Sequence, residues 1–242
     1  MTAKDHLRRL TILTGALTLA ACGSLVPGGS SGASPGMAST GASGQARPAT
    51  RITSAPQSYA ASAEEQGCLA DLGASGARFE RLPDTYAAPG CNKLGTVQLS
   101  ALAGDRSTFG VSNLGPVRCG VAKAFGDWAR FGVDRAARQI LGSPIAKIET
   151  MGSYACRKVA GTERLSAHAR AEAIDVSGFV LADGRRIVLK RDWNGGDAAT
   201  REFLRVVQKS ACKRFGTVLG PEYNAAHEDH FHLEGTGAKF CR

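Results

Sequence analysis

Cysteines in an exported chain constrain this fold more than any other feature of the sequence. An apolar stretch from Leu10 to Ala21 follows Lys4, Arg8 and Arg9. It is too short to span a bilayer but suits the core of a signal peptide. An exported chain folds in an oxidising compartment, where cysteines pair. Six cysteines remain once Cys22, at the end of the signal, is set aside, and there is no C-x-x-C pair, so we expect three disulfides rather than a cysteine-rich zinc site. The sequence does not choose among the possible pairings of Cys68, Cys91, Cys119, Cys156, Cys212 and Cys241.

The end of the signal suggests a lipid anchor. The run Leu19-Ala20-Ala21-Cys22 resembles a bacterial lipobox, which implies that Cys22 is acylated and becomes the first residue of the mature protein. The alternative is an ordinary signal peptide, with Cys22 a spare thiol. Gly23 stands where an Asp would retain a Gram-negative lipoprotein in the inner membrane. The resemblance therefore implies the periplasmic face of the outer membrane.

Composition divides the chain into three segments. We expect a signal peptide over residues 1–21, the lipidated cysteine and a flexible tether over residues 22–59, and one folded domain over residues 60–242. The tether is rich in Gly, Ser, Ala, Pro and Thr. Such a composition has too little apolar surface to offset the entropy of ordering the chain.

The net charge indicates which kinds of partner the chain is suited to bind. Its formal net charge is +9, and a basic surface favours anionic partners. In a cell envelope these are peptidoglycan carboxylates and acidic lipids, so we expect peptidoglycan stem peptides as partners, membrane attachment through the N-terminal lipid, and no nucleic acid. The sequence does not indicate an oligomeric state.

Hydrophobic periodicity predicts an α+β domain with a small antiparallel sheet flanked by helices. We expect the disulfides to staple this domain and the sheet to carry a zinc site, which the histidines described below indicate. Asp183-Gly184 predicts a hairpin turn between two of its strands. The expected helices are Val117 to Phe131 and Asp197 to Phe215. The expected strands are Ile145 to Glu149, Ile174 to Val180, Arg186 to Lys190 and Phe231 to Glu234.

Histidines indicate where the chemistry lies. The chain has five; His6 belongs to the signal, and the other four form two clusters, within Leu165 to Val176 and within His227 to Glu234. Side chains alternate along a strand, so His230, His232 and Glu234 share one face. Adjacent imidazoles make a poor core but a good metal site.

Metal-ligand chemistry explains both clusters together. Neutral imidazole and carboxylate are common zinc ligands, and a catalytic zinc keeps three protein ligands and one open position for water. The small residues between His168 and Asp175 allow these two groups to approach the same rim of the sheet. Ser166 lacks a G-x-S-x-G elbow, so we interpret it as a hydrogen-bonding support for the metal loop rather than as a nucleophile.

The same residues carry a family resemblance. Ser166-x-His168, Ala173-x-Asp175 and the distant His230-x-His232 resemble the superfamily of D-alanyl-D-alanine metallopeptidases, lysostaphin-type peptidases and the hedgehog domain. More narrowly, the chain resembles bacterial proteins with an extensin-like C-terminal domain, and its second cluster is similar to that of MepA-type murein endopeptidases.

The resemblance implies roles for individual residues. His168, Asp175 and His232 correspond to zinc (Zn²⁺) ligands, and His230 and His227 to catalytic histidines. Asp229 stands where some dipeptidases carry a glutamate base, which leaves the proton carrier open among His230, His227 and Asp229; we favour His230, assisted by His227. Ala171 replaces a frequent glycine, a change that we expect to be sterically mild.

The implied function is zinc-dependent hydrolysis of peptide cross-links in peptidoglycan, as a murein endopeptidase at the cell envelope. The alternative is a lipoprotein of the same fold that binds peptidoglycan without cutting it. Arg157 is a candidate partner for the oxyanion or for a substrate carboxylate, or simply a surface residue beside a disulfide. The sequence does not reveal which bond is cut, nor whether the enzyme is an endopeptidase or a carboxypeptidase.

Overall fold

The computed structural model describes residues 61–235 and 239–242. The predicted signal peptide, the predicted lipid anchor at Cys22 and the whole of the predicted tether lie outside the described residues. Among the described helices, none combines the length and the apolar character needed to cross a membrane.

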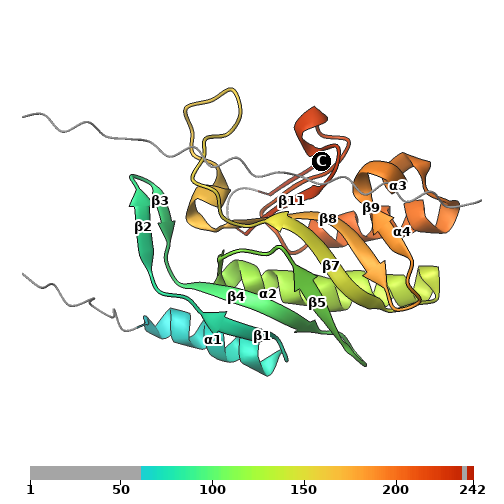
Figure 1. Ribbon diagram of the computed structural model, residues 1–242, viewed down its shortest axis with the longest axis horizontal. Coiled ribbons are helices and arrows are strands. Elements are labelled where there is room, and N and C mark those ends of the chain that lie inside the picture. Colours follow the sequence, from blue (N-terminus) through green and yellow to red (C-terminus); the bar gives the residue numbers. More distant parts are fainter. Residues whose placement is uncertain (1–60, 236–238) are drawn as a thin grey trace, which may run out of the picture. The chain divides into compact units, whose positions relative to one another are not determined.

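One mixed sheet of ten strands organises the described residues (Figure 1). Its order is β1-β4-β5-β7-β8-β11-β10-β12, with β6 beside β4 and β9 beside β8, while β2 and β3 form a separate hairpin. The strands are β1 Arg78–Arg81, β2 Thr85–Ala88, β3 Cys91–Lys93, β4 Thr96–Ala103, β5 Thr108–Ser112, β6 Val117–Arg118, β7 Ile145–Gly152, β8 Ala173–Leu181, β9 Arg186–Val188, β10 Thr217–Leu219, β11 Phe231–Glu234 and β12 Phe240–Cys241.

The predicted α+β class is confirmed, but the prediction of a small, purely antiparallel sheet is wrong. β5 pairs with β7 in parallel, and so does β10 with β12. Parallel neighbours need a crossover connection, and a helical segment between β5 and β7 provides the first one. β1, β4, β5 and β6 add the extra width, and all of them except β4 are too short to show a clear period in the sequence.

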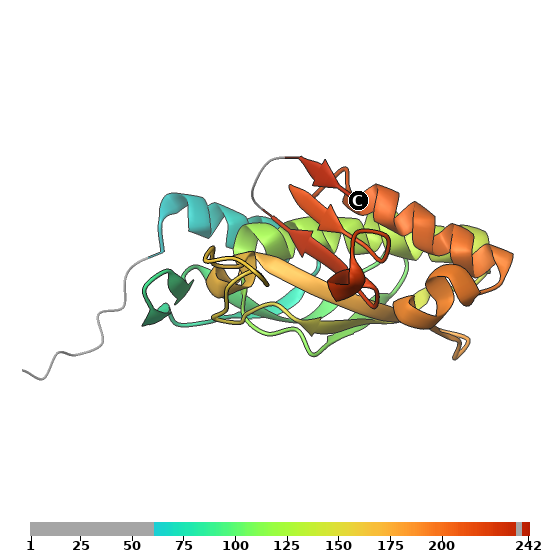
Figure 2. The same cartoon turned by 90° about the horizontal axis from the view of Figure 1, so that it is seen from above.

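Helices cover one face of this sheet, as Figure 2 shows for α1, α2 and α4. The α-helices are α1 Ala63–Ala74, α2 Cys119–Trp128, α3 Leu189–Gly195 and α4 Ala198–Ala211; wider helical turns, η1 Ala129–Asp134 and η2 Ala137–Leu141, continue α2, and single turns form η3 Ala167–Arg170 and η4 Ala225–His227. The prediction of a strand through Lys190 is wrong at its end, because α3 begins at Leu189. Asp197 caps α4 by accepting a hydrogen bond from the Thr200 amide at 2.7 Å.

The core lies between the helices and the sheet. Trp128 of α2 is fully buried; its ring packs on Phe179 of β8 and on Phe215 after α4. Its indole nitrogen donates to the Val207 carbonyl at 2.9 Å, which ties α2 to α4. These contacts hold β8, one of the strands that carries the site, against both helices.

The prediction of three disulfides is confirmed. Cys68–Cys119 joins α1 to α2, and Cys91–Cys156 joins the β2–β3 hairpin to the loop that precedes η3. Cys212–Cys241 joins the end of α4 to β12. Every pairing links segments far apart in sequence, so the local sequence could not reveal it.

Candidate metal centre

Strand register brings two of the proposed ligands together. β8 and β11 pair antiparallel, and His232 is the direct cross-strand partner of Asp175. Side chains at such positions project to the same face of a sheet and lie close together. The alternation predicted for β11 also places Phe231 and Leu233 on the opposite face, where both are fully buried.

A short helical turn places His168 beside this pair. Ser166 caps η3, and its hydroxyl accepts a hydrogen bond from the His168 amide at 3.4 Å. Ala171 ends the turn with a left-handed backbone, at φ 55°. This conformation costs a non-glycine residue about 1 kcal/mol, so replacing the frequent glycine by Ala171 is not as mild as expected.

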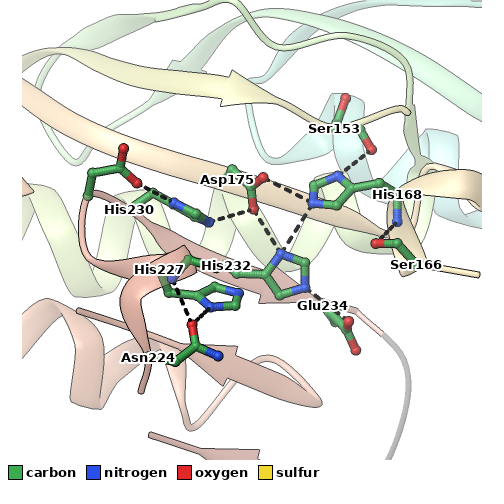
Figure 3. Close-up of polar contacts among 11 residues, drawn as sticks. Ser153, Ser166, His168, Asp175, Asn224, His227, His230, His232 and Glu234 are labelled. Carbon is green, nitrogen blue, oxygen red and sulfur yellow. Dashed lines mark hydrogen bonds and ion pairs between the residues drawn. The ribbon is translucent and has the colours of Figure 1, made fainter. Parts of the chain in front are cut away.

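The ligand atoms of three side chains converge where these segments meet (Figure 3). His168 Nε2 lies 3.0 Å from Asp175 Oδ2, and His232 Nδ1 lies 2.8 Å from Asp175 Oδ1. The two ring nitrogens are 3.2 Å apart. All three side chains belong to residues at most 9% exposed.

The outer nitrogen of each imidazole has a hydrogen-bond partner, so the inner nitrogen is the one available to a cation. His168 Nδ1 donates to the Ser153 carbonyl at 3.1 Å, so His168 Nε2 presents a lone pair when the ring is neutral. His232 Nε2 faces a carboxylate oxygen of Glu234 at 2.9 Å. Histidines that bind metals carry such partners on their second nitrogen.

The donor set fits zinc. Zinc bonds of about 2.0–2.1 Å in a tetrahedron place ligand atoms about 3.3 Å apart. The distances observed here, 2.8 to 3.2 Å, differ from that value by a few tenths of an ångström. A single cation would bind one atom from each of the three side chains, and these three ligands would leave a fourth position open.

Interactions among the buried side chains shift the pKa values of Asp175, His232 and Glu234. Burial alone would raise the pKa of Asp175, but its hydrogen bonds with His168 and His232 prevail and hold the pKa below its usual range. Burial alone would lower the pKa of His232, whereas Asp175 and Glu234 raise it to about 9. Despite burial, the contact with His232 keeps the pKa of Glu234 below its ordinary value.

His230 and His227 line the same site. His230 Nδ1 lies 2.8 Å from a carboxylate oxygen of Asp229, and its Nε2 lies 3.6 Å from Asp175 Oδ1. His227 Nδ1 donates to the Asn224 side chain at 2.7 Å. The His227 ring centroid is 5.2 Å from that of His230 and 5.7 Å from that of His232.

The pKa of His227 is lowered, whereas that of His232 is raised. Burial and the nearby His230 and His232 lower the pKa of His227 to about 4, and the charge of Arg157 also contributes to the lowering. His227 is therefore neutral at pH 7. Arg157 is exposed; besides this electrostatic effect, its carbonyl accepts a hydrogen bond from the Ser166 amide at 3.0 Å.

The structure adds residues that sequence reasoning missed. The sequence placed Glu234 on the face of His232 but gave it no role at the site; Ser153 and Asn224 were not considered. The period of two along β11 was the available signal for Glu234. Ser153 and Asn224 act on histidines 15 and 3 residues away, with no pattern to mark them.

Comparison with known proteins gives one family. The family model described as extensin-like protein C-terminus matches residues 66–242. No curated protein and no solved structure matches the chain. The matched range includes every residue of the candidate metal centre.

Proposed function

The chain belongs to the extensin-like protein C-terminus family, and we propose that it is a zinc-dependent hydrolase of peptidoglycan peptide cross-links. We propose further that it works as a murein endopeptidase at the cell envelope, attached to the outer membrane through Cys22. Its partners would be the stem peptides of the wall.

The convergence of His168, Asp175 and His232 carries this proposal. The outer nitrogens of His168 and His232 each have a hydrogen-bond partner of their own. Their inner nitrogens share the Asp175 carboxylate and meet each other at 3.2 Å. Protons on both inner nitrogens would repel each other in this buried cluster, whereas one shared cation would bind both nitrogens and the carboxylate, and this supports the proposal of a metal site. Zinc held there would polarise a peptide carbonyl and make a bound water acidic near neutral pH.

His230 is placed to move the proton of the reaction. The Asp229 carboxylate can only accept, so His230 Nδ1 carries the hydrogen and Nε2 presents a lone pair toward the ligand Asp175. A base so oriented can take a proton from the attacking water and return it to the leaving amine. His227, neutral at pH 7, lies beside it and can assist.

Peptidoglycan is proposed as substrate because it fits the predicted location and charge. A domain predicted to be exported and lipid-anchored meets the wall first. The basic chain would attract the carboxylates of its stem peptides.

Digestion of purified peptidoglycan tests the proposal. We expect new uncross-linked muropeptides with wild-type protein, and a loss of about 10²–10⁴-fold in rate for His230→Ala with zinc retained. Glu228→Gln is the matched control, since Glu228 is a nearby exposed residue that pairs with Lys190 at 2.8 Å. If wild type and His230→Ala both bind muropeptides and zinc but release no products, the chain is a binding protein instead.

A further inference from the structure

We infer that Arg164, together with Arg157, binds a carboxylate of the substrate peptide beside the candidate metal centre, so that the protein prefers acidic wall peptides to amidated ones. The preference in hydrolysis rests on the proposed function, whereas the binding of a carboxylate can be measured without hydrolysis.

The two arginines lie on a hairpin-like loop, residues 155–166, that leads into η3. Lys158 and Leu165 form its β-bridge. The carbonyls of Arg157 and Arg164 accept backbone hydrogen bonds across the loop, at 3.0 and 2.8 Å, on the two sides of this bridge. Lys158 and Leu165 are therefore directly opposed on one face, and both arginines, each next to a bridge residue, project to the other face. On that face they are diagonal neighbours, a spacing that long side chains can span.

The two faces of this loop have different surroundings. Leu165 points toward the β2–β3 hairpin, since a Cβ on Gly90 would lie 2.4 Å from its Cδ1. Ser166 is the next residue and therefore shares the face of the arginines. It lies at the metal centre, where its hydroxyl accepts from the His168 amide. The face that carries both arginines is thus the one that borders the metal centre.

Electrostatic effects on two residues of the site agree with this placement. Burial lowers the pKa of His227 most, its neighbouring histidines add to the effect, and the charge of Arg157 contributes as well. Burial acts to raise the pKa of Glu234, but its contact with His232 prevails, and the charge of Arg164 adds to the lowering. Coulomb interactions weaken with distance, so both guanidinium groups lie within range of the site.

Both arginines lack a counter-charge in the part of the chain that the structure describes. Neither guanidinium has a hydrogen-bond or ion-pair partner there, and both side chains are exposed to a substrate. On the opposite face of the same loop, by contrast, Lys158 pairs with Glu163. A guanidinium presents its donors in a planar fork that fits a carboxylate. A carboxylate bound here would supply the missing counter-charge.

The loop is held in place before a substrate arrives. In Figure 1 it is dark yellow and rises beside the β2–β3 hairpin, to which the Cys91–Cys156 disulfide ties it. At its base the Ala155 amide donates to the His168 carbonyl at 3.1 Å. Groups that are fixed in advance lose less entropy on binding, so the arginine pair can recognise substrate charge close to the metal.

Hydrolysis of matched muropeptides by the full chain tests the inference. One cross-linked muropeptide keeps its carboxyl groups and the other has them amidated. We expect wild type to prefer the acidic one about 10-fold in kcat/KM, mainly through KM, and Arg164→Gln to lose most of this preference. Lys158→Gln is the control, because it removes a positive charge from the opposite face of the same loop. The preference is a ratio measured on one preparation, so a variant that folds less completely still reports it.

Binding of the same two muropeptides to metal-free protein, measured by calorimetry, separates the inference from the proposed function. Wild type should bind the acidic muropeptide more tightly, and Arg164→Gln should bind both about equally. Equal binding of both by wild type, or a preference that survives in Arg164→Gln, overturns the inference. A binding preference that Arg164→Gln removes, without hydrolysis of either muropeptide by zinc-loaded wild type, would contradict the proposed function and leave the carboxylate site standing.

Discussion

Glu234 is a carboxylate outside the proposed ligand set that affects the candidate metal centre through His232. It contacts the nitrogen of His232 that faces away from the proposed cation and raises the pKa of that ring. A more basic imidazole is a stronger ligand. The residue therefore belongs to the site, although it touches no other ligand in the structure.

Glu234→Gln should weaken zinc binding about 10–100-fold, because the amide keeps the shape of the side chain but not its charge. Competition with a chromophoric chelator measures the affinity. Glu222→Gln is the control, since Glu222 is an exposed residue on the same segment that pairs with Arg205 at 3.1 Å. Equal affinities in the wild type and Glu234→Gln would show that the contact is incidental.

Asp192 holds α3 against β9 by a buried charge. Burial alone would raise its pKa, but the Arg191 guanidinium and the Val188 amide, at 2.7 and 2.8 Å, keep it below the usual range. A carboxyl whose pKa is depressed on folding stabilises the fold above its unfolded pKa and loses that contribution as pH falls.

Asp192→Asn should lower the free energy of unfolding by about 1–3 kcal/mol at pH 7. The difference from wild type should shrink below pH of about 4, where the aspartate in the unfolded chain becomes protonated. Urea unfolding at a series of pH values checks both statements. A difference that does not change with pH would mean that Asp192 acts through its shape and not its charge.

At the scale of elements, the C-terminal strand β12 supports the segment that carries His227. β12 pairs with β10, and its Phe240 packs edge-on against Tyr223, which in turn packs against His227. The Cys212–Cys241 disulfide fixes this strand to α4 and closes a segment that contains η4 and β11.

Replacing Cys212 and Cys241 by serine should loosen this brace. We expect a loss of about 2–4 kcal/mol in stability, faster amide exchange over residues 220–230 and slower hydrolysis, with zinc retained because the metal ligands lie on η3, β8 and β11. The control replaces Cys68 and Cys119, which join α1 to α2 away from His227. Equal effects of both pairs on exchange at residues 220–230 would contradict the brace.

Sequence periodicity predicted some elements closely and others not at all. β11 begins and ends where the alternation of histidines with Phe231 and Leu233 predicted. β2, by contrast, is fully exposed, and no hydrophobic pattern marks it. The composition of Arg186 to Lys190 favours a strand. The Val188 amide, however, donates to the Asp192 side chain, and α3 begins at the next residue, Leu189.

At the scale of the whole molecule, the site depends on long-range register. The sequence named His168, Asp175 and His232, but it could not show that Asp175 and His232 are cross-strand partners, or that η3 folds back on them. The same limit applies to the width of the sheet and to the disulfide pairs. Local patterns give residue types and faces, whereas strand order and pairing arise from the folded core.

Zinc content, measured by elemental analysis beside a muropeptide digest of purified peptidoglycan, tests the central claim most directly. Wild type and His168→Ala are compared after dialysis against zinc and removal of the unbound metal. We predict about one zinc per chain and new uncross-linked products for wild type, with both lost in the variant. A wild-type protein that holds no zinc and leaves the digest unchanged, even with zinc added, would contradict the account.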